Sequence, residues 1–221
     1  MKTKPLTFLL ALTFLFLFSG SVYGEEPEVK NEFYDSGNLK IETHYKNGKK
    51  EGLETRWYES GEKKNKIYYK NGKLEGIATA WYESGAKWSQ LSFKNGKSDG
   101  IDIIWYESGS KDYEVHHQNG KKEGLELLWY ESGSKEKQRH YKNGKLEGIE
   151  TAWYESGAKK YEFYYKNGKL EGVGTDWYES GSIKFQGQFK NGKENGIIKK
   201  WDENGKLTFQ GNFVDGVEEI K

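Results

Sequence analysis

The chain has 221 residues and a formal net charge of +1, a balance that argues against a nucleic-acid-binding protein, because such proteins usually carry a clear basic excess. It contains no cysteine, which excludes a disulfide framework, a thiolate metal site and a lipid-anchored cysteine. Hydrophobic residues make up only 34% of the chain but aromatic residues 16%, which favours a thin sheet with aromatic ladders over a deep globular core.

Residues 1–24 are predicted to be a signal peptide. Lys2 and Lys4 precede an apolar run at 6–18, and small residues ending at Gly24 fit a signal-peptidase site before Glu25. An uncleaved membrane anchor is the alternative, but the run is shorter than the about 20 apolar residues of a membrane span. We therefore expect export to the periplasm, the cell surface or the medium, with no integral membrane span after cleavage. Without Lys2 and Lys4 the 33 basic and 34 acidic side chains that remain give a net charge of −1.

Residues 25–32 are charged and contain Pro27, so they are predicted to form a linker that also blunts the first sheet edge. Residues 33–221 are predicted to form a repeat array with a partial N-terminal unit, seven Trp-bearing units and a partial C-terminal cap. A fixed period of about 20–50 residues is the signature of such architectures. The tryptophans recur every 24 residues, at Trp57, Trp81, Trp105, Trp129, Trp153, Trp177 and Trp201.

Within a unit the sequence alternates with a period of two, which predicts strands. We expect the strand through Ile149 and Trp153 to pair Ile149 with Phe163 of the next strand, so that the large apolar residues share one face. Tyr154, next to Trp153, then points to the other face. The predicted fold is all-β: an elongated, twisted single-sheet meander, or solenoid, of 24-residue β-hairpin repeats. It should contain about sixteen antiparallel strands and be roughly 75 Å long at about 4.8 Å per strand.

Two kinds of turn connect the strands. Glu-Ser-Gly, as at residues 155–157, suits a three-residue hairpin loop with glycine in a left-handed bulge position, which pairs Tyr154 with Ala158. Lys-Asn-Gly-Lys suits a two-residue hairpin, and a second glycine further on is predicted to form a bulge that adds one residue and turns Trp153 to the side of Tyr141. The structural turn and bulge glycines are Gly48, Gly52, Gly72, Gly76, Gly96, Gly100, Gly120, Gly124, Gly144, Gly148, Gly168, Gly172, Gly192 and Gly196.

Residues 185–196, Phe-Gln-Gly-Gln-Phe-Lys-Asn-Gly-Lys-Glu-Asn-Gly, resemble a MORN repeat, whose pattern is Tyr/Phe-x-Gly-x-Phe/Trp-x-Asn/Asp-Gly-x-x-x-Gly. Residues 209–216 repeat its opening, whereas earlier units lack the first glycine and have Phe163 or an equivalent there. Such units resemble the bacterial MORN-repeat-variant family, some members of which are described as antitoxin components of toxin–antitoxin pairs. The resemblance implies this fold and a scaffold that binds proteins or lipids.

The candidate contact surface is the tyrosine column, because exposed tyrosines are common in recognition surfaces. The proposed partner-binding residues are Tyr58, Tyr82, Tyr106, Tyr130, Tyr154 and Tyr178. The tryptophan column is expected to hold the sheet together, with an aromatic groove for a peptide or glycan as an additional role. Trp88, out of phase with that column, is expected to be exposed.

The remaining polar residues predict no reaction chemistry. His116 and His140 share a phase of the repeat, but the same position holds tyrosine elsewhere, so a metal site is not expected. Lysines and acidic residues flank the Asn-Gly turns in columns and predict a solvated edge of mixed charge. We expect no enzyme, cofactor or nucleic-acid partner, and an exported scaffold that binds a protein along an aromatic face. A carbohydrate-binding surface module and an antitoxin are the alternatives.

Overall fold

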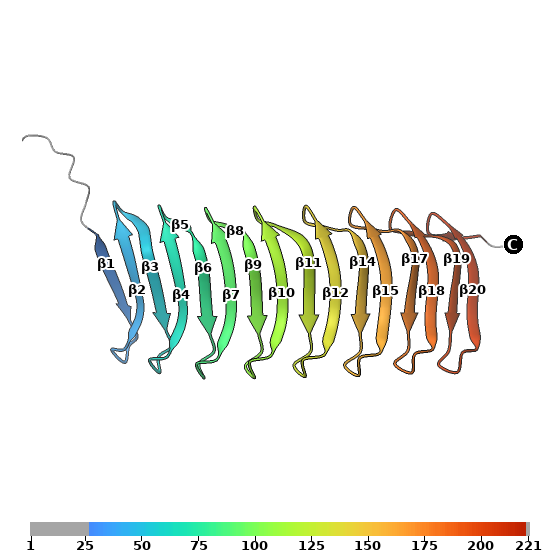
Figure 1. Cartoon of the computed structure of the whole chain (residues 1–221), viewed down its shortest axis with the longest axis horizontal. Helices are drawn as coiled ribbons and strands as arrows, with labels where there is room; N and C mark the ends of the chain where they lie inside the picture. Colours follow the sequence, from blue (N-terminus) through green and yellow to red (C-terminus); the bar gives the residue numbers. More distant parts are fainter. Residues whose placement is uncertain (1–26, 220–221) are drawn as a thin grey trace, which may run out of the picture.

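The computed structural model describes residues 27–219, which form one antiparallel sheet of 21 strands. Each strand pairs with its neighbours along the chain, so the sheet is a meander, and the strands lie side by side with the turns along two long edges (Figure 1). The all-β prediction is confirmed. Residues 1–24, predicted to be a signal peptide, lie outside the described residues.

The strands are β1 (Glu28–Phe33), β2 (Leu39–Lys46), β3 (Lys49–Trp57), β4 (Lys63–Lys70), β5 (Lys73–Leu74), β6 (Gly76–Trp81), β7 (Lys87–Lys94), β8 (Lys97–Ser98), β9 (Gly100–Trp105), β10 (Lys111–Gln118), β11 (Lys121–Trp129), β12 (Lys135–Lys142), β13 (Lys145–Leu146), β14 (Gly148–Trp153), β15 (Lys159–Lys166), β16 (Lys169–Leu170), β17 (Gly172–Trp177), β18 (Ile183–Lys190), β19 (Lys193–Trp201), β20 (Leu207–Val214) and β21 (Val217–Glu218). The strand number exceeds the prediction mainly because β5, β8, β13 and β16 are short pieces that β6, β9, β14 and β17 continue one residue later.

The first strand begins earlier than predicted. Residues 28–32 were assigned to a charged linker, but they belong to β1, which pairs with β2 from Glu28 opposite Tyr45 to Phe33 opposite Leu39. The strand has the same position in the repeat as residues 52–57 of β3, so the partial first unit already supplies a paired strand in spite of its charge.

Both predicted turns are present. In the Glu-Ser-Gly turn, the N–H of Gly157 donates to the Tyr154 carbonyl at 2.9 Å, and the N–H of Tyr154 donates to the Ala158 carbonyl at 2.8 Å. Gly157 has a φ of 88°, the left-handed conformation that the bulge position requires. In the Asn-Gly turn, Asn143 and Gly144 both have positive φ, 53° and 80°, as a type I′ hairpin requires.

The bulge after the Asn-Gly turn has a different size from the one predicted. Gly148 has a φ of 87°, so the glycine is where it was expected. However, four residues separate Leu146 from Thr151, whereas only two separate their partners Gln138 and Tyr141. Because the offset is two residues and side chains alternate with a period of two, Trp153 stays on the face opposite Tyr141. The prediction that the bulge unites the two residues on one face is wrong.

A second bulge lies at the Glu-Ser-Gly end of the sheet. Trp153 is opposite Lys159, but Ala152 is opposite Tyr161, so Lys160 is an extra residue. The offset of one residue moves Tyr161, Phe163 and Tyr165 to the face of Ala152, away from Trp153. Ile149 is consequently opposite Tyr164, and the predicted pair of Ile149 with Phe163 is wrong.

These two bulges divide the side chains between a core face and a Trp face. The core face carries Tyr161, Phe163, Tyr165 and their equivalents, together with the buried side chains Ala80, Val115, Ala152 and Ile198. Aromatic rings there cover small neighbours: a Cβ on Gly174 would lie 2.2 Å from the Phe163 ring. The Trp face carries the tryptophan column and Ile149 with its equivalents.

Candidate functional site

A row of aliphatic side chains crosses the Trp face, one in each Trp-bearing unit. We call it the aliphatic row: Leu53, Ile77, Ile101, Leu125, Ile149, Val173 and Ile197. Leu53 is half-buried, and the other six are exposed by fractions between 44% for Leu125 and 55% for Ile149. The members do not form one contiguous apolar patch, but they recur in every unit, so one elongated partner could contact all of them. This row is therefore the strongest candidate for a contact site.

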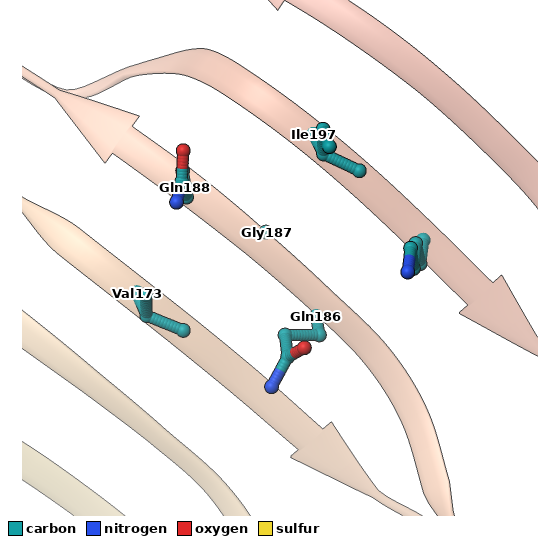
Figure 2. A pocket seen from close by; sticks show the side chains of 6 residues that line it. Val173, Gln186, Gly187, Gln188 and Ile197 are labelled. Atoms are coloured by element: carbon teal, nitrogen blue, oxygen red, sulfur yellow. The ribbon is translucent and has the colours of Figure 1, made fainter.

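The bulge glycine determines where the row lies. Each member directly follows that glycine, as Ile149 follows Gly148, and therefore lies near the middle of the sheet. Figure 2 shows Val173, Gln188 and Ile197 on three adjacent strands, β17, β18 and β19. They line a shallow hollow of about 200 Å³. The row therefore offers apolar contacts with a polar or aromatic side chain between them, such as Gln188 or Tyr164.

A second row on the same face alternates tryptophan with lysine. The Nζ of Lys135 lies 5.6 Å from the centre of the Trp153 ring in the next unit, and Lys159 lies 5.6 Å from Trp177. Lys87 and Lys111 have the same relation to Trp105 and Trp129. All seven tryptophans are half-buried, and a lysine cation lies over the ring of four of them. We call this set the Trp–Lys row; its lysines compete with any ligand that would stack on the rings.

The Asn-Gly turns form a basic edge on the other side of the aliphatic row. Acidic side chains bond to main-chain donors in this edge: the N–H of Asn167 donates to Glu147 at 2.7 Å, and the N–H of Asn143 donates to Glu123 at 2.6 Å. Lysines lie both before and after each of six turns, and one follows the seventh. This lysine edge consists of Lys46, Lys49, Lys70, Lys73, Lys94, Lys97, Lys121, Lys142, Lys145, Lys166, Lys169, Lys190 and Lys193, all exposed.

The tyrosine column lies on the core face, opposite the tryptophans as predicted. Each hydroxyl bonds within the array: Tyr106 donates to the Trp129 carbonyl at 2.8 Å and Tyr130 to the Trp153 carbonyl at 2.8 Å. Burial, together with nearby Asp112, raises the pKa of Tyr106 to about 12. The column is half-buried, so a structural role accounts for the polar tips that were expected to face a partner. The same bond is present at Tyr34, Tyr58, Tyr82, Tyr154 and Tyr178.

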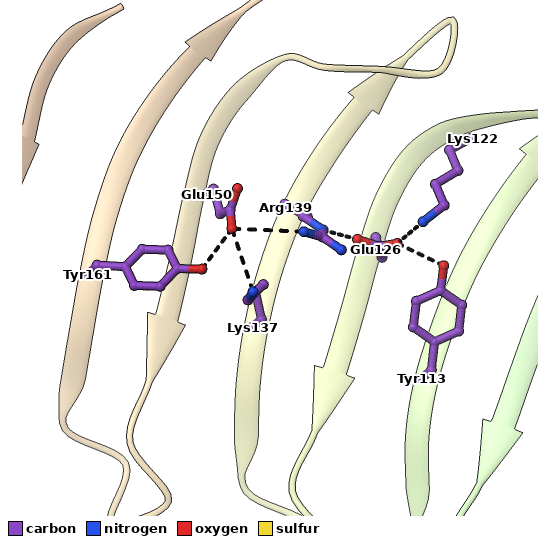
Figure 3. A network of polar contacts seen from close by, with 7 residues as sticks. All are labelled: Tyr113, Lys122, Glu126, Lys137, Arg139, Glu150 and Tyr161. Carbon is purple, nitrogen blue, oxygen red and sulfur yellow. Dashed lines mark hydrogen bonds and ion pairs between the residues drawn. The ribbon is translucent and has the colours of Figure 1, made fainter. Parts of the chain in front are cut away.

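A charged network occupies the middle of the core face and was not anticipated from the sequence (Figure 3). Glu126 is fully buried and accepts hydrogen bonds from Tyr113 at 2.7 Å and from Lys122 and Arg139. Arg139 also lies 4.0 Å from Glu150 of the next unit. Burial raises the pKa of Glu126, but these donors outweigh it and leave that pKa below its usual range. The network joins neighbouring repeats; its charges repeat in the sequence only in part, which is why no pattern indicated it.

Trp88 and the two histidines, the other positions singled out in the sequence, lie on the surface. Trp88 is 46% exposed, as expected, and its ring centre lies 6.4 Å from that of Tyr82. His116 and His140 are exposed on the Trp face. Among residues 27–219, no group of three potential ligands could hold a metal ion. In the same part of the chain, no helix is long and apolar enough to cross a membrane.

The family model described as MORN repeat variant matches this chain at residues 30–47, 50–71, 74–95, 122–143, 146–167, 159–175, 170–191 and 194–215. These segments cover more than half of the chain. The unit between residues 95 and 122 is not matched, although β9 and β10 there keep the register of the other repeats. No curated protein matches the chain.

Proposed function

The chain belongs to the MORN repeat variant family, and from this premise we propose that it is an exported, non-catalytic scaffold that binds a protein partner along its Trp face. Export is supported by the basic start and apolar run of residues 1–24. The observation that carries the binding proposal is the aliphatic row, in which six side chains are exposed by 44–55%.

The Trp face suits a partner better than the core face does. On the core face the tyrosine hydroxyls bond to main-chain carbonyls and the glutamates are buried in ion pairs. Docking there would have to displace interactions that join the repeats. On the Trp face the aliphatic side chains have no cover, so covering them removes apolar surface from water without breaking an existing contact. The repeated array then offers several equivalent contacts to one long partner.

The test uses a photoreactive benzophenone side chain at position 125, in the aliphatic row, and the same group at position 160 on the core face. Crosslinking in the cells that make the protein, followed by mass spectrometry, should capture the same polypeptide from position 125 and not from position 160. Equal capture from both positions, or capture from position 160 alone, would contradict binding along the Trp face.

The captured polypeptide is then purified and its affinity measured against variants. Replacing Ile101, Leu125 and Ile149 together by serine should weaken binding by about tenfold or more, as expected for the apolar centre of an interface. The control replaces Lys64, Lys160 and Lys184, three exposed lysines that lie over core-face tyrosines, by serine. Loss of affinity in the control but not in the row variant would move the site to the core face. A glycan bound with the same dependence on the row would replace the protein partner.

A further inference from the structure

We propose that the aliphatic row binds an acidic amphipathic α-helix. The helix axis runs perpendicular to the strands, along the length of the array, and each heptad of the helix contacts the aliphatic side chain of one repeat. This inference rests on the proposed function and specifies the shape and charge of the partner.

The spacing of the row fits a helix. Successive members, such as Leu125 and Ile149, lie two strands apart, or about 9.6 Å at about 4.8 Å per strand. Seven residues of an α-helix advance about 10.5 Å at 1.5 Å per residue. One heptad therefore matches one repeat, with a mismatch that reaches only about 3 Å over four contacts. An extended strand is a poor match, because three residues cover about the same length but alternate between faces.

The width of the band also fits a helix. Trp153 lies four residues from Ile149 in β14, about 13 Å away at about 3.3 Å per residue. Lys145, on the other side, is closer: the bulge leaves Lys145 opposite Lys142 and Ile149 level with His140, and these two residues of β12 are about 6.6 Å apart along the strand. A helix with side chains is about 10–12 Å wide, so it would rest on the row between the Trp–Lys row and the lysine edge. A polyproline segment has a similar repeat of about 9.3 Å per turn, but it docks on exposed aromatic rings, and lysines already lie over four of the tryptophan rings on this face.

The charges on the two flanks differ. In the Trp–Lys row, Lys111 and Lys159 already form ion pairs with Glu114 and Glu162, at 2.6 Å and 2.8 Å. No lysine of the lysine edge forms an ion pair within residues 27–219. The neighbouring carboxylates, such as Glu147, bond to main-chain N–H groups, and most turns carry two lysines for one carboxylate. The partner helix should therefore carry Asp or Glu on the flank that faces the Asn-Gly turns.

A second copy of this chain is a poorer occupant. If two Trp faces packed with their arrays antiparallel, lysine edge would meet lysine edge. If the strand direction were reversed instead, the lysine edge would meet the lysines of the Trp–Lys row. The first arrangement places like charges together, which costs free energy in an interface. The second offers the lysine edge no excess of negative charge, because Glu114 and Glu162 are already paired with lysines of the Trp–Lys row.

The probes are synthetic peptides tested against the purified protein by fluorescence anisotropy. The first is a four-heptad helix with leucine at the first and fourth positions of each heptad and glutamate along one flank. Three controls have the same length: the same residues in scrambled order, a version with lysine in place of glutamate, and a proline-rich peptide. We expect the acidic heptad peptide to bind at least about tenfold more tightly than each control.

Two sets of variants identify the surface. The Ile101→Ser, Leu125→Ser and Ile149→Ser triple variant and the Lys121→Gln, Lys142→Gln and Lys145→Gln triple variant should each weaken binding of the acidic peptide by about tenfold. Circular dichroism confirms that each variant is folded. Equal binding of the scrambled or lysine peptide, tighter binding of the proline-rich peptide, or indifference to both sets of variants would overturn the helix. If the captured partner depends on the row but no probe binds, the helix inference fails while the proposed function stands.

Discussion

The hydroxyl of Tyr154 donates a hydrogen bond to the main-chain carbonyl of Trp177, 2.9 Å away in the next repeat. The two residues are 23 positions apart in the sequence, so the bond crosses from one hairpin to the next at the edge that carries the Glu-Ser-Gly turns. Since seven equivalent tyrosines make it, the column resists separation of adjacent repeats along nearly the whole array.

Tyr130→Phe removes one such bond and leaves the Trp153 carbonyl without that donor. We expect the free energy of unfolding to fall by about 1 kcal/mol, the usual contribution of one hydrogen bond. Tyr164→Phe is the matched control, because Tyr164 is 41% exposed on the Trp face, and it should change stability by less than about 0.5 kcal/mol. Urea unfolding measures both. Equal losses would refute the structural role of the column.

Gly148→Ala tests the bulge, and Gly174→Ala tests close packing. A Cβ on Gly148 meets nothing within 4 Å, so its φ of 87° is the only obstacle, and we expect a loss of about 1–2 kcal/mol. A Cβ on Gly174 would lie 2.2 Å from the Phe163 ring, and overpacking costs about 1–3 kcal/mol. Adding Phe163→Ala should remove most of the cost of Gly174→Ala, leaving the weaker contact with the Phe189 ring at 3.1 Å. It should leave the cost of Gly148→Ala unchanged. Rescue of both glycine variants would contradict the bulge.

Arg139→Met leaves the buried Glu126 with Lys122 and Tyr113 as its partners. We expect the free energy of unfolding to fall by about 2 kcal/mol. This is less than the about 3–5 kcal/mol expected when a buried charge loses its only ion-pair partner. Arg56→Met, at a more exposed arginine beside Glu54, should cost less. Chemical denaturation at pH 7 compares the two. A larger loss for Arg56→Met would show that the network does not depend on burial.

The same network predicts a dependence on pH. The pKa of Glu126 is lowered in the folded protein, so this group contributes stability above its unfolded pKa of about 4.3 and loses it as the pH falls through the folded value. Stability should therefore decrease below about pH 4.3 in the natural protein. Glu126→Gln should be less stable at pH 7 and should show a weaker decrease on acidification. An unchanged decrease would assign the acid sensitivity to other carboxylates, such as Glu54.

Ile149→Ser distinguishes the aliphatic row from the core. Because Ile149 is 55% exposed, the substitution should cost less than about 1 kcal/mol of stability. Ile198→Ala, at a side chain that is 1% exposed, should cost about 2–5 kcal/mol. Thermal unfolding of both variants measures the two losses of stability. A similar loss at the two positions would mean that the row is part of the core.

The sequence was sufficient to predict the repeat, the two turns and the opposite directions of Trp153 and Tyr154, because period, turn chemistry and strand alternation are local properties. It was not sufficient for the register across a whole hairpin. The bulge at Lys160 has no glycine or proline to mark it, and the size of the bulge at Gly148 depends on hydrogen bonds across two strands. One miscounted residue moves every side chain of the partner strand to the other face.

The error in register also determined which residues were predicted to form the contact surface. Because Ile149 was predicted to share one face with Phe163, the aliphatic residues were not recognised as a separate exposed row, and the tyrosines on the other face became the candidate contact surface. The buried Glu126 and the pair of Asp102 with His117, 2.9 Å apart, were also missed, because neither recurs in every repeat. The position of an aliphatic residue after each bulge glycine is the one signal that could have indicated the row, once both bulges were counted.

The central claim, that a partner covers the aliphatic row, can be measured by the rate of thiol labelling. The natural chain has no cysteine, so Ile149→Cys and Lys160→Cys each supply a single thiol, one on the Trp face and one at the bulge beside the core face. The partner identified by crosslinking is purified and added in excess, so that it is bound most of the time. The labelling rate of the Ile149→Cys variant should then fall by about tenfold or more, while the labelling rate of the Lys160→Cys variant should not change. Protection at 160 with unchanged labelling at 149 would show that the partner binds the core face.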